Sequence, residues 1–180
     1  ELNLISAGRN FGWPQCDDAN RVIEANADSH ACDDATTPEL TFEAHSRPSG
    51  ITFYQGTAFP ELQGDLLVVA SGSATQRLPS GYALYRVCFN DAGNPEICTD
   101  AIGAPTLDET GQPGYSQLLI PVDSQWGYGL DVMHAQGQSF FPDHPVDVAV
   151  SPEGYIAISV MEGRLIQVRP APVRLDESID

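Results

Sequence analysis

The chain has 180 residues, 42% of them hydrophobic, and its 25 acidic residues outnumber 8 basic ones to give a formal net charge of −17. This balance argues against nucleic acid or an anionic membrane surface as a partner, because both are bound through clustered Lys and Arg. No apolar run approaches the roughly 20 residues of a membrane-spanning helix.

Short apolar runs bounded by Gly, Pro, Asn and Asp dominate the chain, and helical periodicity is nearly absent, so the sequence predicts an all-β protein. A first strand is expected over residues 2–5. Residues 15–38 are polar without a sustained pattern and are expected to form a long surface loop. Strands over residues 40–44 and 51–54 are then expected to pair across a turn at residues 47–50.

The middle of the chain has the clearest strand signals. Residues 66–70 form a continuous apolar run, which predicts a strand buried on both faces. Residues 82–89 alternate as a strand does, residues 90–95 read as a turn, and residues 96–100 are expected to return beside the preceding strand.

Residues 101–142 show the weakest patterns, with expected strands at residues 118–122 and 127–133. The following stretch predicts three antiparallel strands joined by short turns, at residues 146–150, 155–160 and 165–168. Such a unit makes most of one blade of a β-propeller.

Four cysteines occur as two local pairs, and neither pair has the C-x-x-C spacing of a zinc or redox site. Of the three connectivities that four cysteines allow, proximity favours Cys16–Cys32 and Cys88–Cys98. Two disulfides would indicate an oxidising compartment, the periplasm or the extracellular space. The alternative is four reduced thiols in a cytosolic protein.

The first 14 residues, ELNLISAGRNFGWP, resemble a signature of the soluble sugar dehydrogenases that depend on pyrroloquinoline quinone (PQQ), the glucose/sorbosone dehydrogenase family. Further stretches resemble that family in the same order: HSRPSGITFYQG at residues 45–56, GDLLV at 64–68, GYALYRV at 81–87 and PVDVAVSPEGYI at 145–156.

In that family the opening signature lies near the middle of a six-bladed β-propeller, so the resemblance implies the C-terminal blades, about three, of such a fold. A blade takes about 40–50 residues, and residues 1–170 are expected to form the partial propeller, with residues 171–180 as a tail. Three blades alone would leave two sheet flanks exposed. The N-terminal half of the propeller is therefore expected from the same or a separate polypeptide.

The resemblance implies oxidation of a sugar hydroxyl by PQQ with Ca²⁺, followed by electron transfer to an acceptor. The family's catalytic histidine and most calcium ligands would precede residue 1, so no catalytic residue is assigned in this chain. The cofactor-binding candidates are His45, Arg77 and His144. The family commonly has arginine where this chain has His144, and residues 71–77 keep only the Gly, the Ser and the final Arg of the family's loop.

Each candidate has a structural alternative. His45 could be a turn histidine bonded to backbone, Arg77 a solvated loop charge, and His144 a residue at a strand entry. Asp147, within an apolar strand, is expected to need a structural partner. The acidic residues that bracket the disulfide loop could supply oxygens to Ca²⁺: Asp17, Asp18, Asp33 and Asp34.

A second function class also fits this sequence. A propeller can serve as a non-catalytic extracellular or periplasmic module for binding or assembly, because a fold does not determine a function.

Overall fold

A computed structural model describes residues 1–17, 22–23, 28, 30, 32–73, 80–100, 102, 104–107, 113–118, 144–161 and 163–170. These residues contain one short 3-10 helix, η1 (Pro60–Leu62), and no α-helix. Their strands are β1 (Pro48–Phe53), β2 (Leu66–Ala70), β3 (Ala83–Phe89), β4 (Pro95–Glu96), β5 (Ala104–Leu107), β6 (Pro113–Gln117), β7 (Pro145–Val150), β8 (Ile156–Val160) and β9 (Leu165–Val168). The all-β prediction is confirmed.

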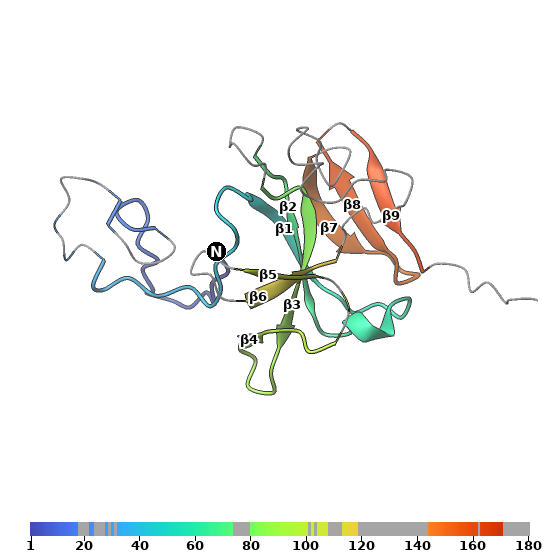
Figure 1. Ribbon diagram of the computed structural model, residues 1–180, viewed down its shortest axis with the longest axis horizontal. Coiled ribbons are helices and arrows are strands. Elements are labelled where there is room, and N and C mark those ends of the chain that lie inside the picture. The colour runs from blue at the N-terminus through green and yellow to red at the C-terminus, as the bar shows by residue number, and fades with distance from the viewer. Residues whose placement is uncertain are drawn as a thin grey trace, which may run out of the picture.

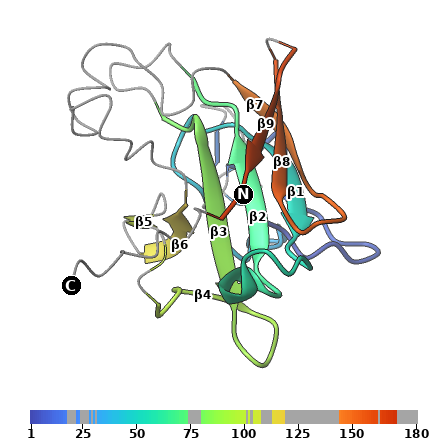
Figure 2. The ribbon, with the colours of Figure 1, turned by 90° about the vertical axis from the view of Figure 1, so that its right-hand side faces the viewer.

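The strands form two antiparallel sheets. The larger has the order β1-β2-β3-β6-β5, with β4 paired to the end of β3, and the smaller has the order β7-β8-β9. Strand β7 packs beside β1 and β2, so the two sheets lie next to each other, as Figures 1 and 2 show. The described residues thus supply two blade-like sheets. The third blade expected from the sequence stays a prediction.

Strand β2 carries the core because both of its faces are covered, as its unbroken apolar run predicts. One face of β2 and β3 packs against the smaller sheet, through Leu67, Val69, Leu84, Val148 and Ile158. The other face packs against residues outside the two central strands, through Leu66, Val68, Tyr85, Leu40, Phe42 and Tyr115. Apolar burial on one face of β2 therefore holds the two sheets together. The opposite face of β2 is partly covered by Leu40, Phe42 and Tyr115.

An apolar groove remains on that second face. Its lining includes Leu4, Ile51, Phe53 and Phe89, and its volume is about 240 Å³. Ile51 and Phe53 are 55% and 52% exposed although they belong to a strand of the main sheet. This face keeps apolar surface that the described residues do not cover.

The strands of the C-terminal unit match the prediction to within one residue, because the short turns with Gly154 and Gly163 set their register. Strands β2 and β3 match similarly. The return predicted at residues 96–100 is confirmed only at its start, because β4 (Pro95–Glu96) pairs with β3 and residues 97–100 form no strand. The disulfides Cys16–Cys32 and Cys88–Cys98 are both present, which confirms the predicted pairing.

Two predictions for the N-terminal part are wrong. Residues 2–5 are not a strand, because only Leu2 forms a bridge, to Leu40. Residues 40–44 do not pair with β1. The backbone turns at His45 and Arg47, which have positive φ, and β1 begins at Pro48 and pairs with β2 instead. Leu40 and Phe42 are still buried, so their apolar side chains reflect core packing rather than a strand.

Strands β5 and β6 were not predicted, because their short segments contain Pro and Gly and lack apolar alternation. Of the expected strand at residues 118–122 only Leu118 is described, directly after β6, and residues 127–133 lie outside the described residues. The proposed tail at residues 171–180 also lies outside them.

Candidate functional site

Three strands of the larger sheet and the first strand of the smaller one have their ends at a common edge. Antiparallel pairing aligns the start of β1 with the end of β2 and the start of β3, through Pro48, Ala70 and Ala83. Ser49 Oγ donates a hydrogen bond to Pro145 O at 3.1 Å, which brings in the start of β7. We call the residues gathered at this edge the loop cluster: Glu43–Arg47, Ser71–Ser73, Ser80–Tyr82 and His144.

Hydrogen bonds to main-chain carbonyls hold the loop cluster together. The donors are Ser71 N to Arg47 O at 3.0 Å, Gly72 N to Ser46 O at 2.8 Å, and Ser80 Oγ to Ala44 O at 2.8 Å. Ser46, Ser71 and Ser80 are all buried. The turn before β1 is thereby fixed to the loops that follow β2 and precede β3.

The backbone of the loop cluster is strained. Among the described residues, the non-glycine residues with positive φ are His45 (65°), Arg47 (56°) and Tyr82 (54°), and all three belong to this cluster. Such conformations cost about 1–3 kcal/mol each and persist where the surroundings enforce them, often at functional sites.

Two glycines allow the loops to approach this closely. Gly72 and Gly81 both have φ of 76°, and a Cβ added at Gly81 would lie 2.6 Å from Gly72 Cα and would overlap Ser46 O. A Cβ at Gly72 would overlap the ring of Tyr82. Neither position has room for a side chain.

Tyr82 and His144 form the contact between the two sheets within the loop cluster. Tyr82 is 5% exposed, and its hydroxyl lies 3.3 Å from His144 Nε2. The two rings are tilted by 57° with centroids 5.0 Å apart. His144 is partly buried, and its carbonyl accepts a hydrogen bond from Met161 N at 2.9 Å.

Glu43 supplies a carboxylate to the same cluster. Its main-chain N–H donates to Tyr115 Oη at 2.9 Å, which anchors the residue to β6. Glu43 is exposed as a whole residue, but partial desolvation by the surrounding protein raises the pKa of its carboxyl group above the ordinary value of 4.5, and a hydrogen bond from Gly81 N opposes that shift.

We expect Glu43→Gln to stabilise the protein at neutral pH and to change little at pH values below 4.5. A carboxyl group whose pKa rises on folding contributes stability at low pH, and that contribution is lost as the pH rises through the raised pKa. Gln keeps an oxygen for Gly81 N but carries no charge. Urea midpoints at acidic and neutral pH measure the effect, with exposed Glu96→Gln as the control. Equal shifts of the midpoint at both pH values would contradict the prediction.

Both His45 and His144 belong to the loop cluster, and their shared role in cofactor binding stays a prediction. Arg77 lies outside the described residues, in the segment between Ser73 and Ser80, which themselves pair at the edge of the cluster. The sequence reasoning overlooked Arg47, an exposed cation in the same turn as His45. Its position between His45 and Pro48 in the family-like stretch was the available signal.

Asp147 is exposed rather than buried, and its Oδ1 accepts a hydrogen bond from Val148 N at 2.9 Å. Its place in an apolar run therefore does not require an arginine partner. Within the described part of the chain, no group of three His, Cys, Asp or Glu residues could hold a metal ion.

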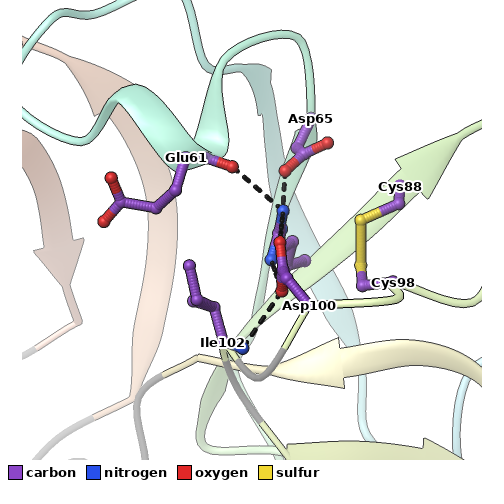
Figure 3. The surroundings of a disulfide bond; sticks show 7 residues. Glu61, Asp65, Cys88, Cys98, Asp100 and Ile102 are labelled. Carbon is purple, nitrogen blue, oxygen red and sulfur yellow. Dashed lines mark hydrogen bonds and ion pairs between the residues drawn. A yellow bond between two sulfur atoms is a disulfide. The ribbon is translucent and has the colours of Figure 1, made fainter.

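A second polar cluster lies at the opposite end of β3, near η1 and β4. Arg86 is 3% exposed, and its guanidinium donates to Asp65 at 2.5 Å, to both oxygens of Asp100 at 2.7 and 2.9 Å, and to Glu61 O at 3.0 Å (Figure 3). The Cys88–Cys98 disulfide lies beside it and holds the segment that carries Asp100 near β3 (Figure 3). This buried ion pair was not predicted, because its carboxylates come from separate loops.

Burial raises the pKa of Asp65 despite its contact with Arg86, whereas the hydrogen bond from Arg86 lowers the pKa of Asp100. Each of the three guanidinium nitrogens donates to at least one protein oxygen, so we interpret this cluster as structural.

The fold is similar to that of two groups of solved structures. The iodide and calcium structures of a Trichoderma reesei carbohydrate-active enzyme of family AA12 align with TM-scores of 0.55 and 0.53, each at 19% identity over 88% of this chain. The PQQ domain of pyranose dehydrogenase from Coprinopsis cinerea, in its holo form, aligns with a TM-score of 0.50 at 19% identity over 79% of the chain. The chain therefore has the fold of part of a PQQ-type propeller domain.

The sequence comparison covers the first part of the chain. Residues 1–78 match the model of the glucose/sorbosone dehydrogenase family, so this part of the chain is similar to that family. A comparison with curated protein sequences finds no match. The chain spans 38% of each AA12 structure and 31% of the pyranose dehydrogenase domain. Among its described residues, no helix is long and apolar enough to cross a membrane.

Proposed function

We propose that this chain forms part of a quinoprotein sugar dehydrogenase and that its loop cluster contacts PQQ while a sugar hydroxyl is oxidised. The observation that carries the proposal is that the turn of His45 and Arg47 and the residue His144 lie at one edge of two adjacent sheets. The strained backbone at His45 and Arg47 supports it, because a turn of ordinary structure would not need those conformations.

The donor set of the loop cluster suits an anionic quinone. PQQ carries three carboxylates, which bind best to cations and oriented N–H donors. Arg47 offers a planar guanidinium, His45 and His144 offer imidazoles, and Arg77 is proposed as a further cation. When bound, PQQ would supply the electron sink for the sugar. The residues named here would bind and orient its carboxylates, and we assign none of them the abstraction of the sugar proton.

Calcium is proposed only for the complete protein. Its ligands would be carboxylate or carbonyl oxygens, and the resemblance implies that most of them precede residue 1.

The remaining blades are proposed to come from another part of the same polypeptide or from a separate one. Support comes from the partial coverage of the AA12 structures and from the exposed Ile51 and Phe53, which would pack against a further blade. The two disulfides favour a periplasmic or extracellular location. A sugar substrate and an electron acceptor complete the proposed set of partners.

A non-catalytic binding or assembly subunit is the second candidate. It is favoured by His144, which stands where family members commonly have arginine and lacks the planar guanidinium that binds a carboxylate through two hydrogen bonds. A propeller that had lost its quinone contacts would need no cation at this position.

Titration of the intact protein with PQQ, with and without CaCl₂, separates the two candidates. We expect quenching of tryptophan fluorescence on binding and dye-linked oxidation of aldoses. Arg47→Ala should weaken PQQ binding about 10- to 100-fold, the loss expected for a hydrogen bond to a charged group. Arg169→Ala is the control, because Arg169 follows β9 and bonds the exposed Gln167. Undetectable PQQ binding would favour the non-catalytic candidate. Binding unaffected by Arg47→Ala would contradict the proposed contact between PQQ and the loop cluster.

A further inference from the structure

We infer that Tyr82 is a positioning residue that sets the orientation and tautomer of His144, an inference that rests on the proposed quinone contact of His144. Three observations carry it: the constraint on Tyr82, the geometry of its contact with His144, and the origin of the two residues on different sheets.

Tyr82 has little freedom to move. Its φ of 54° places it in the left-handed region, which a tyrosine rarely adopts. Its ring lies against Gly72, where even one added methyl group would overlap it. Tyr82 is also 5% exposed, so both its backbone and its ring are confined.

The hydroxyl at the end of this confined ring meets His144 Nε2 at 3.3 Å. His144 is fixed at its backbone by the bond from Met161 N and by the following Pro145. The side chain of His144 is thus anchored at its main chain and again at Nε2. A phenol is a good hydrogen-bond donor, and donation to Nε2 favours the tautomer with its proton on Nδ1.

This tautomer has a consequence for ligand binding. An imidazole protonated at Nδ1 presents an N–H donor, as an arginine does, whereas the other tautomer presents an acceptor that would repel a carboxylate. Tyr82 precedes β3 of the larger sheet and His144 precedes β7 of the smaller one, so the contact also fixes the two edges of the loop cluster relative to each other.

Tyr82→Phe tests the inference, because it removes the hydroxyl and keeps the ring in its place against Gly72. Nitrogen-15 NMR of the His144 ring should show a shift of population toward the Nε2-protonated tautomer. The affinity for PQQ should fall about three- to tenfold. The urea midpoint should change little. Tyr155→Phe, in the turn between β7 and β8 at the other end of the smaller sheet, should change none of these quantities.

A double-mutant cycle with His144→Gln separates positioning from a direct contact. If Tyr82 acts through His144, then Tyr82→Phe should cost little further affinity once His144 is replaced. Additive losses, or an unchanged His144 tautomer in Tyr82→Phe, would overturn the inference. Should the wild-type protein fail to bind PQQ, the proposed function fails, while the NMR measurement still decides whether Tyr82 sets the tautomer.

Discussion

Arg86→Met is expected to lower the free energy of unfolding by about 3–5 kcal/mol, the usual cost of breaking a buried ion pair on one side. Methionine fills much of the volume of the arginine stem, so lost packing contributes little. The penalty arises because Asp65, whose side chain is 13% exposed, and the carbonyl of Glu61 would lose their donor in a largely dry environment. Urea denaturation at neutral pH measures the loss.

Two companion variants show whether burial is the cause. Asp100→Asn should cost less than Arg86→Met, because Asp100 is 41% exposed and water can replace part of what it loses. Arg169→Met removes an exposed arginine and should change the free energy of unfolding by about 0.5 kcal/mol or less. A loss for Arg86→Met no larger than that of Arg169→Met would show that the buried ion pair contributes nothing to stability.

The parts of the fold that could be predicted are those in which local pattern and tertiary environment agree. The unbroken apolar run of β2 predicts a strand buried on both faces, and the structure has one. In β7 to β9 the short turns set the register, and the strands pair as the sequence pattern predicts. Residues 40–44 show the opposite case. Leu40 and Phe42 alternate as a strand would, but their burial comes from packing on β2 and β3 without a ladder of hydrogen bonds.

The candidate site divides in the same way. His45 and His144 could be found from the sequence because family-like motifs surround them. The contact between Tyr82 and His144, and the ion pair of Arg86 with Asp65 and Asp100, join residues that are far apart in the chain or belong to irregular loops. No periodicity marks such contacts. The left-handed backbone of Tyr82 and the close approach of its ring to Gly72 are likewise visible only in the three-dimensional arrangement.

Gly81→Ala is expected to lower the free energy of unfolding by about 2–5 kcal/mol and to weaken PQQ binding. An alanine at positive φ costs about 1–2 kcal/mol by itself, and overpacking adds about 1–3 kcal/mol. The added methyl group would overlap Ser46 O and approach Gly72 Cα, both of which are backbone atoms that no rotamer change can move. The turn that carries His45 would therefore have to shift away from β3.

Gly163→Ala is a matched control that separates the two terms of this cost. Gly163 has φ of 80°, close to the 76° of Gly81, but a Cβ there would meet no atom within 4 Å. Gly163→Ala should lower the free energy of unfolding only by the cost of an alanine at positive φ, about 1–2 kcal/mol, and should leave PQQ binding unchanged. Adding Gly72→Ala to Gly81→Ala should cost less than the sum of the single changes, because the first methyl already separates the two loops. Equal losses for Gly81→Ala and Gly163→Ala would mean that the loops are not packed as closely as the loop cluster requires, and the convergence of His45 with His144 would lose its physical basis.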